Sequence, residues 1–183
     1  MNVKKIDSSN MLYHIKSLPN QIKESIKIIN EYEFKIKDFK KINSIVIVGM
    51  GGSAIGGDIV NSIISDYCKI PFQVIRDYNL PSWINQNTLV ICVSYSGNTE
   101  ETLSCFDEAI NRNTFIVGIT SGGKLHQKLN ANNLDSISIP NNKPPRASIG
   151  YISVLILLVL EKNNIVDISS EKYLFDTSLK LEA

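Results

Sequence analysis

The chain has 183 residues, of which 43% are hydrophobic and 20% charged, and its formal net charge is +1 at pH 7. A chain of this length is expected to form a single domain with a sizeable core, and the composition is that of an ordinary globular protein. The near-neutral charge gives no electrostatic reason to expect nucleic acid or an anionic membrane as a partner.

The first predicted element is a helix over residues 8–31, with Ile22, Ile26 and Ile29 at helical spacing and a turn at Leu18-Pro19. Short runs of branched apolar residues then predict strands over residues 44–48, 71–75, 89–93, 114–119 and 136–139. The segments between them have helix length, with helical periodicity at Ile55, Ile59 and Ile63, at Leu103, Phe106 and Ile110, and over residues 149–160. A last helix is expected in EKYLFDTSLKLEA, where no residue signals an end and the apolar side needs a packing partner, which suggests a continuation.

Continuous Val/Ile strands that alternate with helices are typical of a parallel sheet covered on both faces. With right-handed crossovers, this pattern predicts a doubly wound α/β fold with five parallel strands and an N-terminal helical extension. We expect the strand order 2-1-3-4-5, in which strands one and three are neighbours at the switch point.

Cysteine usage and the lack of targeting signals predict a cytoplasmic protein. Cys68, Cys92 and Cys105 are odd in number and form no CxxC pair, so we expect buried free thiols in a reducing compartment. No apolar stretch follows the lysines of MNVKK as a secretory signal would require. The apolar segment over residues 149–160 is too short to span a bilayer.

Two loops of small residues follow the first and third predicted strands. The first is GMGGS, over residues 49–53, and the second is SYSGNT, over residues 94–99. In a doubly wound sheet they face each other across one crevice and offer hydroxyls and the backbone N–H groups of two helix N-termini. Neither loop contains Lys or Arg, so the sequence predicts a phosphate site built from dipoles and hydroxyls.

Other interpretations of these loops compete with ligand binding. Asn98 or Thr99 is a candidate helix cap, since Asn98 and Glu101 have capping-box spacing, and Glu100 and Glu101 are expected to point away from a phosphate. Gly49, Gly51 and Ala54 match the dinucleotide fingerprint, with Asp77 as a late candidate for the ribose partner. A P-loop is excluded because Gly57-Asp58 stands where Lys-Ser/Thr is required.

With GMGGSAIGGD, SYSGNTEETL, TSGGKL and PPRASIGY in this order, the chain resembles the sugar isomerase (SIS) domain family. The similarity runs from Leu18 to about Glu161 and is greatest to the N-terminal half of the bifunctional phosphoglucose/phosphomannose isomerases. That resemblance implies interconversion of glucose 6-phosphate or mannose 6-phosphate with fructose 6-phosphate through an enediolate, without metal or other cofactor.

The resemblance also implies roles for individual residues. Arg146 matches the arginine that neutralises the enediolate oxygen, a role in keeping with the electrostatic stabilisation of developing charge. The phosphosugar would be held by Gly52, Ser53, Ser94, Ser96 and Thr99. In the family, the glutamate base and the ring-opening histidine lie in a second SIS domain, and neither His14 nor His126 falls on a family motif.

The resulting expectation is a helical segment over residues 1–43, a phosphosugar-binding SIS domain over residues 44–162, and the start of a connection to a second SIS domain over residues 163–183. The leading interpretation is an aldose–ketose isomerase represented by its first SIS domain, incomplete for catalysis alone. A non-catalytic phosphosugar-binding module and an NAD-binding domain stay open as alternatives. An exposed apolar face, and therefore self-association or pairing with a second SIS domain, is also expected.

Overall fold

A computed structural model describes residues 7–141 and 143–182, so residues 1–6, Asn142 and Ala183 of the predicted segments lie outside it. Its strands are β1 (Ser44–Val48), β2 (Phe72–Ile75), β3 (Thr88–Ser94), β4 (Phe115–Thr120) and β5 (Asp135–Ser138). Every neighbouring pair is parallel and the order is β2-β1-β3-β4-β5. The predicted α/β fold, strand order and strand positions are confirmed.

The helices are α2 (Met11–Lys16), α3 (Leu18–Glu31), α4 (Gly52–Ile64), α5 (Glu100–Asn111), α6 (Gly123–Ala131), α7 (Ile149–Lys162) and α8 (Ser170–Glu182). Two short 3₁₀ turns are η1 (Phe39–Lys41) and η2 (Pro145–Ala147). The predicted helix over residues 8–31 is two helices that meet at Ser17. Pro19 lies in the first turn of α3, where its missing N–H breaks no helical hydrogen bond.

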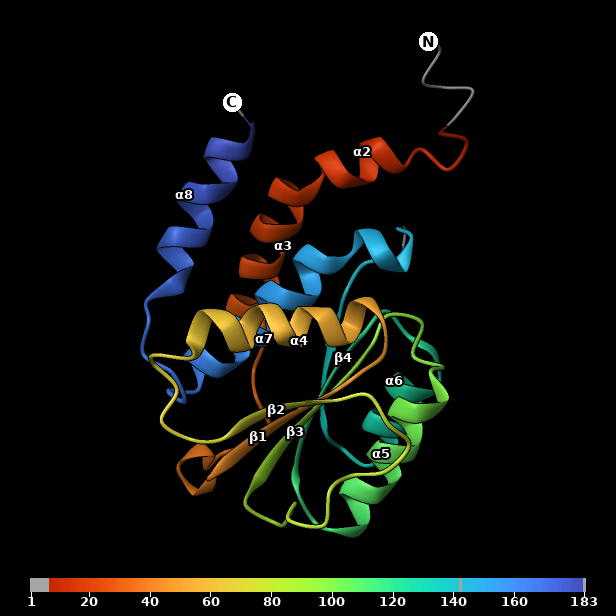
Figure 1. Ribbon diagram of the computed structural model, residues 1–183, viewed down its shortest axis with the longest axis vertical. Coiled ribbons are helices and arrows are strands. Elements are labelled where there is room, and N and C mark those ends of the chain that lie inside the picture. The colour runs from red at the N-terminus through yellow and green to blue at the C-terminus, as the bar shows by residue number, and fades with distance from the viewer. Residues whose placement is uncertain (1–6, 142, 183) are drawn as a thin grey trace.

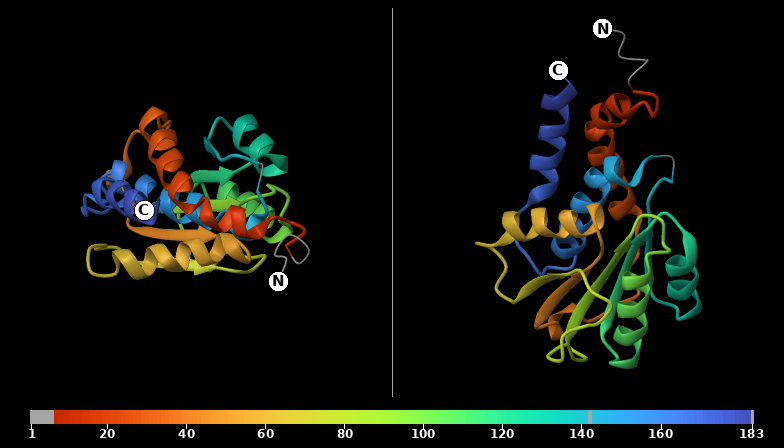
Figure 2. Two further views of the ribbon diagram at one scale, coloured as in Figure 1. Left: turned by 90° about the horizontal axis from the view of Figure 1, so that it is seen from above. Right: turned by 45° about the vertical axis from the view of Figure 1, so that its right-hand side comes forward.

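Helices cover the sheet on both faces, with α3, α4 and α7 on one and α5 and α6 on the other (Figure 1). Alternate residues of each strand serve the two layers: Ile45 and Ile47 belong to the first core, whereas Val46 and Val48 belong to the second. Both views in Figure 2 show α7 lying against the sheet, and ten of its residues are buried. This explains the nearly continuous apolar run over residues 149–160.

Helices α4 and α8 leave apolar side chains exposed. On α4, the periodic Ile55, Ile59 and Ile63 are 50%, 39% and 47% exposed, while Val60 and Ile64 pack into the core. The predicted helix is therefore present, but its isoleucine stripe faces solvent. The predicted terminal helix packs as α8 on α3 and α7, with Leu179 still 47% exposed.

All three cysteines are free thiols, as predicted. Cys92 and Cys105 are buried, and burial raises the pKa of Cys105 to about 12, so neither is a ready nucleophile. Cys68, expected to be buried, is half-buried near the end of α4. No helix in the described part of the chain is both long and apolar enough to cross a membrane.

Candidate functional site

The two small-residue loops lie side by side at the carboxyl edge of the sheet. In the β1–β3 pairing, Val48 is opposite Cys92, so the chain leaves β1 next to the last residues of β3. A Cβ on Gly49 would lie 3.0 Å from the carbonyl oxygen of Val93, which is tighter than ordinary contact. Glycine at this position therefore lets the first loop pass directly beside the second.

The first loop opens α4 without a side-chain cap. Gly51 is the N-cap residue, with φ of 50°, and no side chain bonds to the first N–H groups of the helix. Ser53 is 8% exposed, and within residues 7–141 and 143–182 its hydroxyl has no hydrogen-bond partner. The start of α4 therefore offers peptide N–H groups and one hydroxyl to an anion.

The second loop is organised by its own hydroxyls. Ser94 Oγ accepts a hydrogen bond from the backbone N–H of Gly97 at 3.1 Å and shares one with Thr99 Oγ1 at 2.8 Å. Ser96 Oγ accepts from the N–H of Asn98 at 3.2 Å. Ser94 is only 1% exposed, whereas Ser96 is exposed and Thr99 is half-buried. Ser96 and Thr99 are therefore more accessible to a ligand than Ser94, whose hydroxyl shapes the loop.

Of the two candidate caps of α5, Thr99 is the N-cap residue and Asn98 is not, and the capping box of Asn98 and Glu101 is not formed. No side chain caps the helix. The Asn98 side chain instead accepts a hydrogen bond from the N–H of Lys124 at 3.1 Å, at the start of α6. The first N–H groups of α5 therefore stay available, as at α4.

The acidic residues at the start of α5 turn toward the loop that follows β2. The carboxylate of Glu101 raises the pKa of Tyr78, and desolvation and the carboxylate of Glu100 act in the same direction. This placement agrees with the expectation that both acids point sideways rather than at a bound phosphate.

The TSGGKL motif supports the second loop from the side. A Cβ on Gly97 would lie 1.8 Å from the carbonyl oxygen of Gly122, and one on Gly123 would lie 2.4 Å from that of Ser96. The N–H of Leu125 donates to the carbonyl oxygen of Gly97 at 2.8 Å. Both glycines therefore allow two backbone segments to touch, which fixes the second loop.

Arg146 lies on η2, immediately beside the first loop. A Cβ on Gly52 would be 3.8 Å from the carbonyl oxygen of Pro145 and 4.0 Å from Cα of Arg146. The Arg146 side chain is exposed, and its guanidinium has no hydrogen-bond or ion-pair partner among the described residues. The backbone of Arg146 thus lies next to the start of α4, and its exposed side chain is free to turn toward a ligand there.

The histidines differ from each other in surroundings. His126 makes hydrogen bonds through both ring nitrogens, to Ser136 at 3.0 Å and to Asn130 at 2.9 Å, as a packed structural histidine does. His14 lies on α2, which packs against η2, and its Nδ1 is buried without a partner among the described residues. No group of three or more His, Cys, Asp or Glu in the described chain could hold a metal ion.

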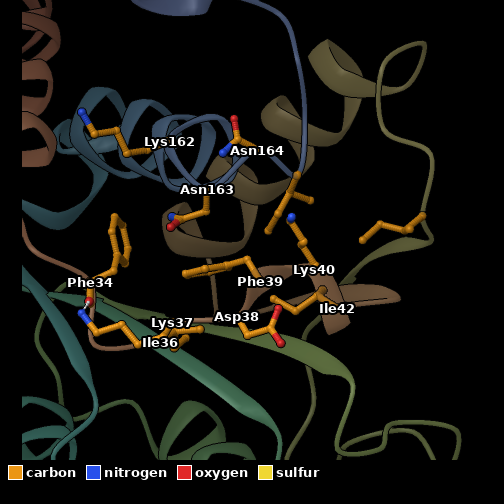
Figure 3. Close-up of a pocket in the computed structure, with 12 residues that line it drawn as sticks. Phe34, Ile36, Lys37, Asp38, Phe39, Lys40, Ile42, Lys162, Asn163 and Asn164 are labelled. Carbon is orange, nitrogen blue, oxygen red and sulfur yellow. Dashed lines mark hydrogen bonds between the residues drawn. The ribbon is translucent and has the colours of Figure 1, made fainter.

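A cavity lies at the opposite edge of the sheet, where the strands begin. It measures about 730 Å³ and lies between the segment that precedes β1 and the end of α7 (Figure 3). Phe34 and Phe39 pack edge to face there, and Lys37 donates to the carbonyl oxygen of Phe34 at 3.0 Å. None of the predicted site residues lines this cavity.

Comparison with known proteins shows the family of this chain. Residues 38–142 match the family model described as SIS domain. A bifunctional phosphoglucose/phosphomannose isomerase of Caldicellulosiruptor bescii is 40% identical over 86% of this chain and 46% of its own length. One from Aquifex aeolicus is 39% identical over 75% of this chain and 44% of its own length. The chain thus spans about half the length of these relatives.

Among solved structures, tagatose-6-phosphate ketose/aldose isomerase from Escherichia coli superposes with a TM-score of 0.68 at 20% identity. That match covers 93% of this chain and 52% of the other. At this identity the likeness concerns the fold.

Proposed function

This chain belongs to the SIS domain family, and on that basis we propose that it binds a sugar phosphate as half of an aldose–ketose isomerase site. The substrates would be glucose 6-phosphate or mannose 6-phosphate and fructose 6-phosphate, in keeping with the names of its relatives. Arg146 is the proposed catalytic residue. The phosphosugar is held by Gly52, Ser53, Ser94, Ser96 and Thr99, with no cofactor.

One observation carries the proposal: Arg146 and two uncapped helix N-termini converge at one edge of the sheet. Peptide N–H groups and the hydroxyls of Ser96 and Thr99 suit a phosphate, which is bound without a lysine and can be released. Arg146 suits the opposite end of the sugar, where negative charge develops on the enediolate oxygen.

The same residues lack a convincing general base. Proton transfer between C1 and C2 needs a base within hydrogen-bond reach of the carbon acid. His126 is committed to Ser136 and Asn130, and the carboxylates of Glu100 and Glu101 face Tyr78. We therefore expect the 183-residue chain to bind fructose 6-phosphate weakly and to isomerise it poorly or not at all.

Calorimetric titration and a coupled assay of fructose 6-phosphate turnover test these two expectations separately. Binding without turnover is the expected result. Robust turnover would overturn the claim of incompleteness and direct attention to His14, beside η2. Absence of sugar phosphate binding would overturn the proposed function itself.

Two other functions stay as outcomes of the same titrations. In a non-catalytic phosphosugar-binding module, Arg146→Ala would leave every activity of the chain, alone or completed by a second SIS domain, unchanged. In a dinucleotide-binding domain, NAD(H) would bind and sugar phosphates would not. Asp77, the residue that this alternative needs, is two positions beyond β2, and its side chain accepts from the N–H of Tyr78 at 2.6 Å.

We further propose that a second copy of this chain, or a second SIS domain, covers α4. The exposed stripe of Ile55, Ile59 and Ile63 starts beside the first loop and continues into a cavity of about 450 Å³ between α4 and α8. Isoleucines four residues apart form a ridge that can pack against its own symmetry mate. Light scattering is expected to show a dimer or larger assembly, and a clean monomer would count against it.

The proposed organisation assigns phosphosugar binding to residues 44–162, with residues 1–43 as a helical support and residues 163–183 as the connection to a partner domain. Free thiols and a metabolic role suit the cytoplasm, where we place the protein. Limited proteolysis that leaves a core of residues 44–162 able to bind fructose 6-phosphate would support these limits.

A further inference from the structure

The segment that carries Arg146, residues 143–147, is exposed at Pro145 and Arg146. Side chains from elsewhere in the chain hold its two ends. At its C-terminal end, the buried side chain of Gln21 donates from Nε2 to the carbonyl oxygen of Ala147 at 2.8 Å. The same side chain accepts from the N–H of Tyr151 at 3.4 Å. Helix α3 therefore anchors the end of this segment that leads into α7.

The other end is held by Tyr95, which lies between Ser94 and Ser96 in the second loop. Its hydroxyl donates to the carbonyl oxygen of Pro140 at 3.0 Å and accepts from the N–H of Lys143 at 3.1 Å. Its backbone carbonyl accepts from the N–H of Ser121 at 3.1 Å. Tyr95 is 8% exposed and its ring belongs to the core. One residue thus joins the loop proposed to hold phosphate to the segment that carries the cation.

A single large aromatic residue in a loop of small ones needs this explanation. The serines, Gly97 and Thr99 of this loop have a role in the proposed phosphate site. The Tyr95 hydroxyl has none there, because it bonds to Pro140 and Lys143. Two hydrogen bonds to backbone groups fix the position of a segment rather than that of one side chain.

We infer that Tyr95 is a positioning residue that sets the place of Arg146 relative to the phosphate loop. The inference rests on the proposed function, and it adds a residue that acts through Arg146 without touching the substrate. Loss of the Tyr95 hydroxyl leaves the hydroxyls of the second loop in place and removes two of the hydrogen bonds that hold the N-terminal end of the Arg146 segment, where Lys143 Nζ also donates to Ser17 Oγ at 2.9 Å. The guanidinium then samples positions away from the developing charge, and its contribution falls.

A matched pair of ligands separates the two ends of the site. Gluconate 6-phosphate and sorbitol 6-phosphate share a six-carbon chain and a phosphate, and only the first carries negative charge at C1. Arg146 is expected to favour the carboxylate and to be indifferent to the neutral alcohol. The ratio of the two dissociation constants therefore reports on Arg146, while the affinity for sorbitol 6-phosphate reports on the phosphate loop.

The test compares Tyr95→Phe with Tyr32→Phe in the full chain. The hydroxyl of Tyr32 likewise donates to one oxygen, here the side-chain Oδ1 of Asp135 at 3.1 Å, and accepts from one backbone N–H, that of Ser136 at 2.8 Å, but at the opposite edge of the sheet. Tyr95→Phe is expected to weaken the binding of gluconate 6-phosphate about fivefold and to leave the affinity for sorbitol 6-phosphate unchanged. Tyr32→Phe is expected to change neither.

A double-mutant cycle shows whether Tyr95 acts through Arg146. Arg146→Ala is expected to weaken the binding of gluconate 6-phosphate about tenfold or more. In the double variant, Tyr95→Phe is expected to cause no further loss of affinity for this ligand. Amide hydrogen exchange gives a readout that needs no ligand: Tyr95→Phe should speed exchange at Ala147 and Ser148, whose N–H groups bond within the η2 turn at 2.9 Å and 3.1 Å.

Each other outcome overturns the inference in a recognisable way. If Arg146→Ala acts and Tyr95→Phe does not, Tyr95 does not position the arginine. Equal weakening of both ligands by Tyr95→Phe would make Tyr95 a support of the phosphate loop alone. If the unaltered chain binds neither ligand, the proposed function fails and this inference fails with it, whatever the exchange at Ala147.

Discussion

The two edges of the sheet offer opposite surroundings to a ligand. At the carboxyl edge α4 and α5 begin, so peptide N–H groups without a side-chain cap and the positive ends of two helix dipoles lie there. At the other edge α7 ends at Lys162 beside the large cavity, and carbonyl groups of its last turn accept hydrogen bonds from the residues that follow the helix. Lysines gather there, and Lys37 already serves a backbone carbonyl of the protein. The cavity and its lysines would therefore favour a ligand site at the amino edge of the sheet. The anion-binding chemistry of the helix N-termini favours a ligand site at the carboxyl edge.

Gly97→Ala is expected to have the largest effect, because it damages the carboxyl edge directly. The new Cβ would meet the carbonyl oxygen of Gly122 at 1.8 Å in a backbone with φ of 68°. We expect a loss of about 3 kcal/mol or more in the free energy of unfolding. Gly51→Ala is the control: it has φ of 50° but nothing within 4 Å, so about 1 kcal/mol is expected. Urea unfolding of both variants measures the difference, and equal losses would contradict the contact.

Asp135→Asn tests the amino edge, which the structure holds together by a buried carboxylate. Asp135 is fully buried and accepts hydrogen bonds from the N–H groups of Lys35 and Ile36 at 2.8 and 3.1 Å. An amide NH₂ facing these donors should cost about 2–4 kcal/mol of unfolding free energy, with sugar phosphate affinity retained in the folded protein. Asp38→Asn, at an exposed ion pair with Lys41, is expected to cost less than about 1 kcal/mol.

Ser96→Ala and Thr99→Ala compare the two edges as ligand sites. Each substitution is expected to lower the affinity for fructose 6-phosphate about tenfold, which is the effect of losing one hydrogen bond to a charged group. Lys37→Ala and Lys40→Ala, at the edge of the large cavity, should leave that affinity unchanged. Calorimetry decides: weaker binding in the lysine variants and not in the hydroxyl variants would move the site to the opposite edge.

Glu108→Gln is expected to have the smallest effect and to depend on pH. The N–H of Leu80 at 2.6 Å, and then Arg112, hold the pKa of Glu108 below its ordinary value of 4.5. Its stabilising effect is therefore fully present above pH 4.5 and is lost as the pH falls through the lower folded-state pKa. The difference in free energy of unfolding between the Glu108→Gln variant and the unaltered chain should therefore become smaller as the pH is lowered from 7 to below 4. Asp107→Asn, exposed on the same helix, provides the control, and a gap that widens in acid would contradict the assignment.

The strands and their order followed from local sequence, because runs such as SIVIV suit only a strand covered on both faces. The two small-residue loops were expected to be neighbours as well, since the carboxyl ends of neighbouring parallel strands lie at the same edge. Side-chain direction did not follow: Ser94 turns inward, and Asn98 bonds to Lys124 across 26 positions. The buried Asp135 and the bridge from Tyr95 to Lys143 depend on segments 100 and 48 positions apart, which no local pattern reveals.

Helices α4 and α5 begin without a side-chain cap, so the proposed phosphate would also act on the stability of the fold. An anion there would complete two helices that the chain leaves open, so the folded state gains stability only when the anion is present. At a hundred times the dissociation constant, that gain is about 2.7 kcal/mol. The stability of the protein should therefore depend on the buffer anion. In phosphate the protein should melt at a higher temperature than in a buffer whose anion cannot bind at the starts of α4 and α5.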